Sequence, residues 1–473
     1  MNEYFDISET ICAISSPPGV GALAVIRISG KNSIFIISRL FEPFKGSTLS
    51  ETRSHSLRYG VIKREGEILD EVVVSLFRAP HSFTGEESAE IYCHGSTYIQ
   101  QEIIRLLVDS GIRMALPGEF SKRAFLNGKM DLAQAEAVAD LISSETLAAH
   151  KNALSQMRGG FSKELAQMRK NLLNLVSLME LELDFSDEDV EFADRGQLKA
   201  MVSKSIEHIS LLIESFKLGN VVKNGVPVAI VGATNTGKST LLNAILGEER
   251  AIVSDIHGTT RDYIEDLVNL GGVMFRFIDT AGIRKSTEQI EILGIERTFE
   301  KIRSASVVIL VLDAECPDNF FESVSQLKTA IDKGDQKVII LLNKIDTVVH
   351  PEKMLREIKK IAESAGLTHT GVMAASAKNG EGLDNLKSSI IESQINISFT
   401  ASSTLVTNSR HYQALTFANE ALKRVESGLE KQLSTDLLTQ DIREALFHIG
   451  EIVGEVSTEE VLGNIFSKFC IGK

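Results

Sequence analysis

The chain has 473 residues, 43% of them hydrophobic and 24% charged, as expected of an ordinary soluble protein with about three domains. Its formal net charge of −14 argues against a protein that coats nucleic acid by electrostatics alone. No apolar run approaches the roughly 18 to 20 residues that span a bilayer, and the first residues lack signal-peptide or transit-peptide features. We therefore expect a cytoplasmic protein with no membrane partner.

Residues 1–118 alternate short β-branched runs with turns. The pattern predicts strands at 11–15, 22–28, 71–77 and 89–93, and helices at 33–40 and 97–109. Strands and helices mixed along one segment predict a compact α+β domain.

Residues 119–220 are rich in Ala and Leu, and their apolar residues recur at spacings of three and four. The same helical periodicity returns in residues 393–473, where it predicts helices at 410–432, 436–456 and 458–469. Ser457 and Glu460 form a plausible capping box for the last helix. Two helical parts on either side of residues 221–392 suggest one helical bundle domain into which that segment is inserted.

A phosphate-binding loop is predicted at Gly232-Ala-Thr-Asn-Thr-Gly-Lys-Ser239, between an apolar run and a helical pattern. Glycines let backbone N–H groups approach phosphate oxygens, and the start of a helix adds a partial positive charge. Lys238 would neutralise the outer phosphates, and Ser239 would ligate magnesium. A Gly-containing loop is the alternative, which this context disfavours. The predicted nucleotide-binding residues here are Gly232, Asn235, Thr236, Gly237, Lys238, Ser239 and Thr240.

Further motifs indicate that the base is guanine. Asp346 of Asn343-Lys-Ile-Asp346 would accept hydrogen bonds from the ring N–H and the exocyclic amine of guanine, which adenine cannot satisfy in the same way. Asp279 would hold the magnesium shell and the Gly282 N–H would sense the terminal phosphate, while residues 376–378 would close over the base. The predicted residues are Asp279, Thr280, Ala281, Gly282, Asn343, Lys344, Asp346, Ser376, Ala377 and Lys378. Together with continuous apolar strands, they predict a Ras-like P-loop GTPase domain with a mainly parallel sheet.

The catalytic group is less obvious. Thr260, in a predicted switch loop, is the natural second protein ligand of magnesium, but the apolar Ile283 stands where Ras-like proteins carry a water-orienting glutamine. Asn235 and the carbonyls of residues 254–258 could complete a monovalent cation site that stabilises charge as an arginine finger does. Glu291 is a candidate for orienting water. From its spacing alone, the favoured interpretation is an exposed glutamate at the start of a helix.

Four stretches outside the GTPase motifs are distinctive: Ser16-Pro-Pro-Gly19, Ala24-Val-Ile-Arg-Ile-Ser-Gly30, PGEFSKRAFLNGKMDLAQAE from Pro117 to Glu136, and Cys470-Ile-Gly-Lys473. The GTPase motifs themselves are shared with Era-like and EngA-like proteins. Through the four distinctive stretches, the whole chain resembles the MnmE (TrmE) family of tRNA uridine-modification GTPases.

The resemblance implies an N-terminal folate-binding and dimerisation domain (1–118), a helical domain built from 119–220 and 393–473, and an inserted G domain (221–392). By position, Arg27, Glu90, Lys129 and Lys473 match residues that bind 5-formyltetrahydrofolate or a related tetrahydrofolate. Cations suit the glutamate tail of a folate, and Glu90 can accept from its amino-pterin edge. Alternatively, Arg27 and Glu90 pair with each other, and both lysines are surface charges.

The resemblance also implies a homodimer that works with the flavoprotein MnmG (GidA), in a heterotetramer-type complex, on the wobble uridine of certain tRNAs. Its cofactors would be GTP, magnesium, potassium and the folate. The potassium ligands would be Asn235, Ser254, Ile256 and Thr259, and the catalytic residues Glu291, Asn235 and Cys470. A buried cysteine on the last helix is the alternative for Cys470. Alternative functions are a ribosome-assembly GTPase of the Era/EngA type, a stand-alone folate-dependent transferase, and a scaffold without chemistry of its own.

Overall fold

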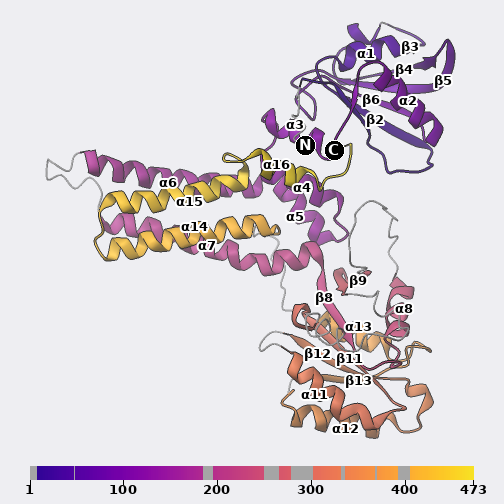
Figure 1. Cartoon of the computed structure of the whole chain (residues 1–473), viewed down its shortest axis with the longest axis vertical. Coiled ribbons are helices and arrows are strands. Elements are labelled where there is room, and N and C mark those ends of the chain that lie inside the picture. The colour runs from indigo at the N-terminus through magenta and orange to yellow at the C-terminus, as the bar shows by residue number, and fades with distance from the viewer. Residues whose placement is uncertain are drawn as a thin grey trace. The chain divides into compact units, whose positions relative to one another are not determined.

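The computed structural model divides into two compact units (Figure 1). Unit 1 comprises Met1–Ile142, Ala153–Glu207 and Ala414–Lys473, and unit 2 comprises Ser143–Asn152 and His208–Gln413. The residues that the structure describes are 8–46, 48–184, 195–249, 266–278, 302–331, 336–367, 370–392 and 405–472.

The N-terminal part of unit 1 is a seven-stranded sheet in the order β3-β4-β5-β6-β2-β1-β7. Its strands are β1 (Ile11–Ile14), β2 (Leu23–Ser29), β3 (Phe41–Pro43), β4 (Ser56–Arg64), β5 (Glu67–Phe77), β6 (Ser88–His94) and β7 (Arg113–Met114). Alternate residues of β2, Ala24, Ile26 and Ile28, are buried in a core that includes residues of helices α1 (Ser33–Leu40) and α2 (Thr97–Asp109). The opposite face of β2 therefore carries Arg27 away from that core.

The sequence predicted both of these helices with the observed bounds, but it missed strand β4. The alternation of β4 is interrupted by Gly60, which lowers the strand signal. A Cβ atom at Gly60 would lie 2.2 Å from the carbonyl oxygen of Glu42 on β3. The glycine is therefore required by a close approach of two backbones.

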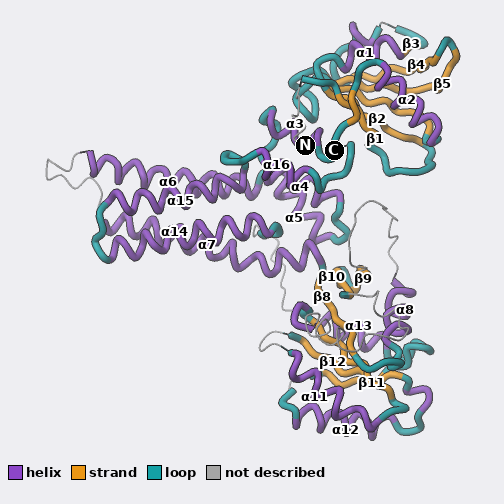
Figure 2. The backbone as a smooth tube through the Cα atoms, viewed as in Figure 1, coloured by secondary structure: helices purple, strands orange, loops and turns teal. Residues whose placement is uncertain are grey.

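The helical elements are α3 (Glu119–Leu126), α4 (Leu132–Ile142), α5 (Leu147–Met157), α6 (Gly160–Asp184), α7 (Arg195–Asn224), α14 (Ser409–Glu430), α15 (Thr435–Val453) and α16 (Glu459–Phe466). Within unit 1, α6 packs against α15, and Lys199 of α7 pairs with Glu430 of α14 at 2.8 Å. Helices far apart in sequence therefore lie side by side (Figure 2). The predicted cap of the last helix was wrong by one residue, because the side chain of Thr458, not Ser457, accepts from the Val461 N–H.

Unit 2 contains a six-stranded sheet in the order β13-β12-β11-β8-β10-β9, parallel except for the edge strand β9. Its strands are β8 (Val226–Val231), β9 (Asp266–Leu270), β10 (Val273–Phe277), β11 (Val307–Asp313), β12 (Lys337–Asn343) and β13 (Gly371–Ala374). Its helices are α8 (Lys238–Glu249), α11 (Phe320–Ala330), α12 (Pro351–Ser364) and α13 (Leu383–Glu392). Short 3-10 helices are η1 (Leu49–Glu51) in unit 1, and η3 (Pro317–Asn319) and η4 (Ile345–Thr347) in unit 2.

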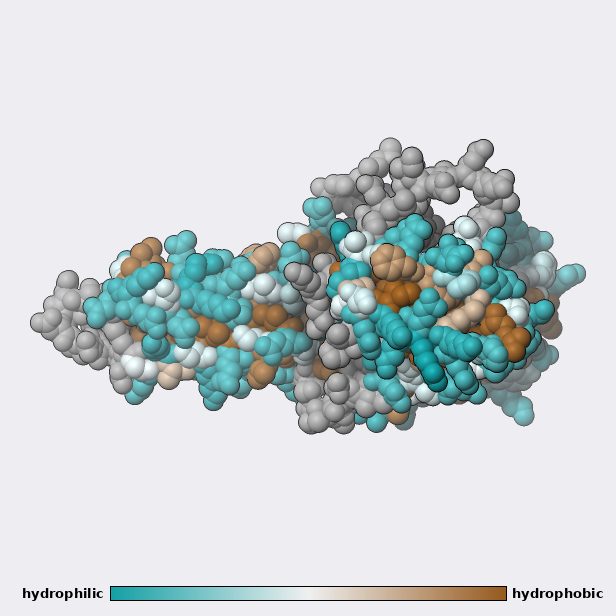
Figure 3. All heavy atoms as spheres, turned by 90° about the horizontal axis from the view of Figure 1, so that it is seen from below, coloured by the Kyte–Doolittle hydropathy of each residue, from teal (hydrophilic) through white to brown (hydrophobic). Residues whose placement is uncertain are grey.

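Two hydrophobic cores cover the two faces of this sheet. One includes residues of α8 and α13, and the other includes residues of α11 and α12. Both faces of β11 are therefore buried, which explains its unbroken apolar sequence. Among the described helices, none is long and apolar enough to cross a membrane. Hydrophilic side chains predominate on the face seen in Figure 3, and hydrophobic ones form scattered patches.

Candidate nucleotide and folate sites

The predicted phosphate-binding loop connects β8 to α8, and two glycines give it its shape. Gly232 has a φ of 149°, and a Cβ there would lie 2.3 Å from the Val311 carbonyl oxygen. Gly237 has a φ of 90°, and a Cβ there would lie 2.3 Å from Asn343 Nδ2. Asn235 adopts the left-handed conformation at a φ of 63°. Only glycine fits the first two positions, so the loop passes close to β11 and to the end of β12.

Lys238, the first residue of α8, folds back over this loop. Its Nζ donates to the carbonyl oxygens of Gly232 at 2.9 Å and Ala233 at 2.6 Å. Burial lowers the pKa of Lys238, because its ammonium group has lost hydration. A phosphate oxygen placed here would replace these carbonyl contacts with a charged partner, which is the role predicted for this lysine.

Asn343 lies at the end of β12 and is 2% exposed. Its Nδ2 donates to the Thr236 carbonyl oxygen at 2.9 Å, and its Oδ1 accepts from the Ala377 N–H at 3.0 Å. One buried amide therefore joins the phosphate-binding loop to the segment predicted to close over the base. The sequence identified Asn343 as part of the site but not as the connection between these two loops.

The residues predicted to recognise the base also contact one another. Ser376 Oγ donates to Asp346 Oδ1 at 2.6 Å, and this hydrogen bond lowers the pKa of Asp346. Lys344 has a φ of 63°, and its Nζ contacts Asp313 Oδ2 at 2.6 Å and Glu315 Oε2 at 3.4 Å. The Asp313 hydrogen bond raises the pKa of Lys344. An ionised carboxylate and a charged ammonium are therefore held at this edge of the sheet.

Sequence reasoning missed Asp313 and Glu315 as partners of Lys344. Asp313 is the last residue of β11, directly paired in register with Asn343 at the end of β12. Polar residues at the carboxyl ends of adjacent parallel strands meet at one edge, so the position of Asp313 was the available signal.

Several predicted residues lie outside the described part of the chain, and their roles stay predictions. They are Ser254, Ile256, Thr259, Thr260, Asp279, Thr280, Ala281, Gly282, Glu291 and Lys473. Ser239 and Thr240, by contrast, lie in the first turn of α8, where the magnesium ligand was predicted. Lys378 follows the buried pair Ser376 and Ala377 and is exposed.

In unit 1, Arg27 and Glu90 face each other across β2 and β6, where they are paired in register. Arg27 Nε and Nη2 lie 3.0 and 2.9 Å from Glu90 Oε1, and Tyr92 Oη donates to Glu90 Oε2 at 2.7 Å. The ion pair considered as the alternative is thus present. A carboxylate has about four acceptor positions, so Glu90 retains capacity for a ligand.

The C-terminal segment reaches the same cluster. The Gly472 carbonyl oxygen accepts from Arg27 Nη1 at 3.3 Å and from Ser15 Oγ at 3.1 Å. Gly472 has a φ of 95°, and a Cβ there would lie 2.5 Å from the Ile14 carbonyl oxygen. Cys470 is exposed and follows the end of α16, so the alternative of a buried cysteine on the last helix is wrong.

Two aromatic rings that the sequence did not single out flank Arg27. The guanidinium carbon lies 5.6 Å from the centroid of the Phe83 ring and 5.8 Å from that of Phe120, within the range of cation–π contacts. Lys129 is exposed, and its Nζ donates to the Pro80 carbonyl oxygen at 3.0 Å. Phe83 and Pro80 belong to one loop, so that loop touches both candidate cations.

Two family models and named relatives match almost the whole chain. Residues 10–129 match the family model described as GTP-binding protein TrmE N-terminus, and residues 132–470 match that of the MnmE helical domain. A protein of Bacteroides thetaiotaomicron named tRNA modification GTPase MnmE is 51% identical over 98% of this chain and 99% of its own length. The protein of that name in Parabacteroides distasonis is 52% identical over 98% of this chain and 100% of its own. The solved G domain of the T. maritima FeoB iron transporter is 27% identical over 36% of this chain and 98% of its own, with a TM-score of 0.26.

A parallel sheet with a phosphate-binding loop and a guanine-type recognition segment defines a P-loop GTPase. The near full-length matches extend the similarity to the residues on both sides of the GTPase domain. The chain belongs to the MnmE family of tRNA modification GTPases. Because the relatives are named as tRNA modification GTPases, the alternative of a ribosome-assembly factor is not favoured.

Proposed function

We propose that this chain couples potassium-stimulated GTP hydrolysis to the modification of certain tRNAs. As a homodimer, and with a flavin-dependent partner of the MnmG (GidA) type, it would help place an aminomethyl-type group on carbon 5 of the wobble uridine. A tetrahydrofolate would donate the one-carbon unit. The observation that carries the GTPase part is the Asn343 amide, which joins the phosphate-binding loop to the base-recognition segment.

In the nucleotide site, each residue has a separate task. Lys238 exchanges its loop carbonyls for phosphate oxygens, and Asp346 accepts two hydrogen bonds from guanine while Ser376 keeps its carboxylate oriented. Magnesium, held by Ser239 and Thr260, would neutralise charge on the phosphates. Glu291 would orient the attacking water.

A monovalent cation site would form from Asn235 and the backbone of residues 254–259. The side-chain amide of Asn235 supports this assignment, because its oxygen can ligate a hard cation, and the left-handed conformation of the residue is one that asparagine tolerates well. Potassium at this position would supply positive charge next to the phosphates.

The folate would bind at the cluster of Arg27, Glu90 and the C-terminal segment. Glu90 is held by Arg27 and Tyr92 and can still accept from the amino group of a pterin. Lys129 and Lys473 would contact the glutamate tail, and Cys470 would act in the modification nearby. The contact of Gly472 with Arg27 supports a shared site for the two ends of the chain.

Steady-state GTP hydrolysis in potassium chloride and in sodium chloride, at matched ionic strength, tests this proposal. We expect a higher rate in potassium, rising with protein concentration as dimers form. Asn235→Lys places an ammonium group where the cation would bind, so it should remove the difference between the two salts. A wild-type rate that is indifferent to the cation would contradict the mechanism, and an unchanged salt response in Asn235→Lys would contradict the assignment of Asn235.

A further inference from the structure

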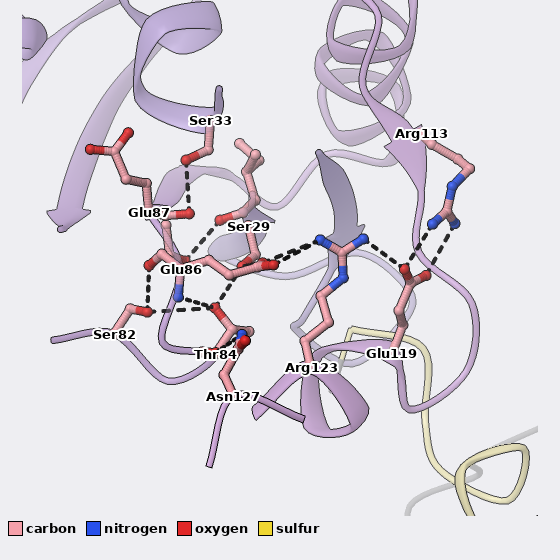
Figure 4. Close-up of polar contacts among 12 residues, drawn as sticks. Ser29, Ser33, Ser82, Thr84, Glu86, Glu87, Arg113, Glu119, Arg123 and Asn127 are labelled. Carbon is pink, nitrogen blue, oxygen red and sulfur yellow. Dashed lines mark hydrogen bonds and ion pairs between the residues drawn. The ribbon is translucent and has the colours of Figure 1, made fainter. Parts of the chain in front are cut away.

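A buried network of ion pairs lies in unit 1 between the sheet and α3 (Figure 4). Arg123, which is 2% exposed, donates from Nη2 to Glu119 Oε1 at 2.9 Å and from Nη1 to both carboxylate oxygens of Glu86, at 3.3 and 3.2 Å. Arg113 completes it through Glu119, at 2.7 and 3.1 Å. Glu86 and Glu119 thus each have a guanidinium partner, which restrains the positions of the two carboxylates.

The same network fixes the loop formed by residues 80–86. Ser29 Oγ donates to Glu86 Oε2 at 2.7 Å, and it lies 2.6 Å from Thr84 Oγ1. On the other side, Asn127 Nδ2 donates to the Thr84 carbonyl oxygen at 2.7 Å. The loop is thus attached to β2 through Ser29 and to the end of α3 through Asn127.

Both attachment points lie two residues from a candidate folate ligand. Ser29 follows Arg27 on the same face of β2, and Asn127 precedes Lys129. The loop also contacts both cations directly, since Phe83 lies over Arg27 and Lys129 donates to the Pro80 carbonyl oxygen. In addition, Gly85 leaves space for the stem of Lys129, because a Cβ there would lie 3.3 Å from its Cγ and Cδ atoms.

We propose that Glu86 and Asn127 are positioning residues for folate binding, because they hold the loop that sets the separation of Arg27 and Lys129. This inference rests on the proposed function of Arg27 and Lys129 as folate ligands. A folate carries its pterin and its glutamate carboxylates at opposite ends. Arg27 holds Glu90, which would take the pterin, and Lys129 would take the tail, so a fixed separation of Arg27 and Lys129 selects a ligand with both parts.

Asn127→Ala in the full-length chain is the first test, because Asn127 is exposed and its replacement leaves the buried charges paired. Calorimetric titration would compare 5-formyltetrahydrofolate with 5-formyltetrahydropteroate, which lacks the glutamate tail. We expect about a fivefold loss of affinity for the tailed ligand, the scale of one hydrogen bond, and little change for the other. Asn171→Ala removes an exposed asparagine that accepts from Gln167 on α6, and as the matched control it should bind both ligands like the wild type.

Two further variants separate positioning from general loss of structure. If Asn127 acts through Lys129, the double variant with Lys129→Ala should bind scarcely more weakly than Lys129→Ala alone. Glu86→Gln should weaken the tailed ligand about tenfold or more, as expected for loss of a charge-assisted bond. Glu87→Gln makes the same change at the neighbouring carboxylate, which pairs with Arg78 and not with Arg123, so it should not weaken the tailed ligand. Thermal unfolding of each variant checks that it is folded.

The outcomes distinguish this inference from the proposal on which it rests. Three results would overturn the positioning role. Asn127→Ala could weaken both ligands equally, or its effect could add to that of Lys129→Ala. Both Asn127→Ala and Glu86→Gln could also bind with wild-type affinity. If Arg27→Ala and Lys129→Ala bind the tailed ligand as well as the wild type, the proposed folate site itself is wrong. A loss of affinity that is confined to the tailed ligand and does not add to that of Lys129→Ala supports both the positioning role and the proposed folate site.

Discussion

Replacement of Asp346 by asparagine tests the guanine specificity most directly. In the structure the Ser376 hydroxyl donates to Asp346 Oδ1 at 2.6 Å, which lowers the pKa of Asp346, orients its carboxylate and occupies one acceptor position. The remaining positions can accept from the ring N–H and the amine of guanine. Asp346→Asn removes the charge and turns one acceptor into an amide donor that faces the guanine amine.

The expected effect follows from counting these bonds. Each hydrogen bond to a charged group changes affinity by roughly ten- to a hundredfold. Loss of one such bond, together with weakening of the other, predicts a drop in GTP affinity on the order of a hundredfold or more. Xanthine carries a carbonyl where guanine carries the amine, so the new amide donor should favour xanthosine triphosphate.

Fluorescence titration with labelled guanosine and xanthosine nucleotides would measure both affinities, and hydrolysis of the two triphosphates would follow in parallel. Ser376→Ala is the control, because it keeps the carboxylate and removes only its orienting bond. We expect it to weaken GTP binding severalfold without any gain for xanthosine triphosphate. Unchanged GTP affinity in Asp346→Asn, or an equal loss for both nucleotides, would refute the assignment of Asp346.

Three other predictions concern the contacts that hold the sites together. Asn343→Ala should destabilise unit 2 by about 2 to 4 kcal/mol in urea unfolding, since two buried backbone groups lose their partner, whereas the exposed Asn379→Ala should cost far less. Gly472→Ala should weaken 5-formyltetrahydrofolate binding on the order of tenfold, because a side chain at a φ of 95° is strained and its Cβ would meet the Ile14 carbonyl. Burial would raise the pKa of Glu119, but hydrogen bonds from Arg113, the Leu116 N–H and Arg123 lower it overall. The ionised Glu119 therefore stabilises the folded state fully above the pKa of the unfolded chain, about 4.3. This stabilisation is lost as the pH falls through the lower pKa of the folded state. Urea unfolding of wild type and Glu119→Gln from pH 6 to pH 3 should show a smaller acid dependence in the variant.

Each of these predictions has an opposite result that would count against it. An Asn343→Ala protein as stable as Asn379→Ala would mean that the two loops are held by other contacts. Wild-type folate affinity in Gly472→Ala would separate the C-terminal segment from the Arg27 cluster. Equal acid dependence in wild type and Glu119→Gln would show that other carboxylates govern unfolding at low pH.

The sequence predicted what depends on local pattern. The helices at 33–40 and 97–109 have the predicted bounds, and the order of apolar strands after residue 221 gave the parallel sheet. Contacts between distant segments could not be predicted in the same way. The amide of Asn343 meets Thr236 only because Gly237 allows the backbones to approach, and no spacing rule connects residues 107 positions apart.

The two candidate sites share one physical property: their charged side chains already have protein partners. Lys238 donates to loop carbonyls, and Arg27 contacts Glu90 and the Gly472 carbonyl. Phosphate binding at Lys238 would therefore be an exchange of hydrogen bonds, and its affinity would reflect the difference between old and new partners. Carbonyl groups are weaker partners for an ammonium than phosphate oxygens, which favours exchange at Lys238. At Arg27 the existing partner is a carboxylate, so a ligand gains most by adding bonds to the free acceptor positions of Glu90 and to Lys129, without breaking the pair.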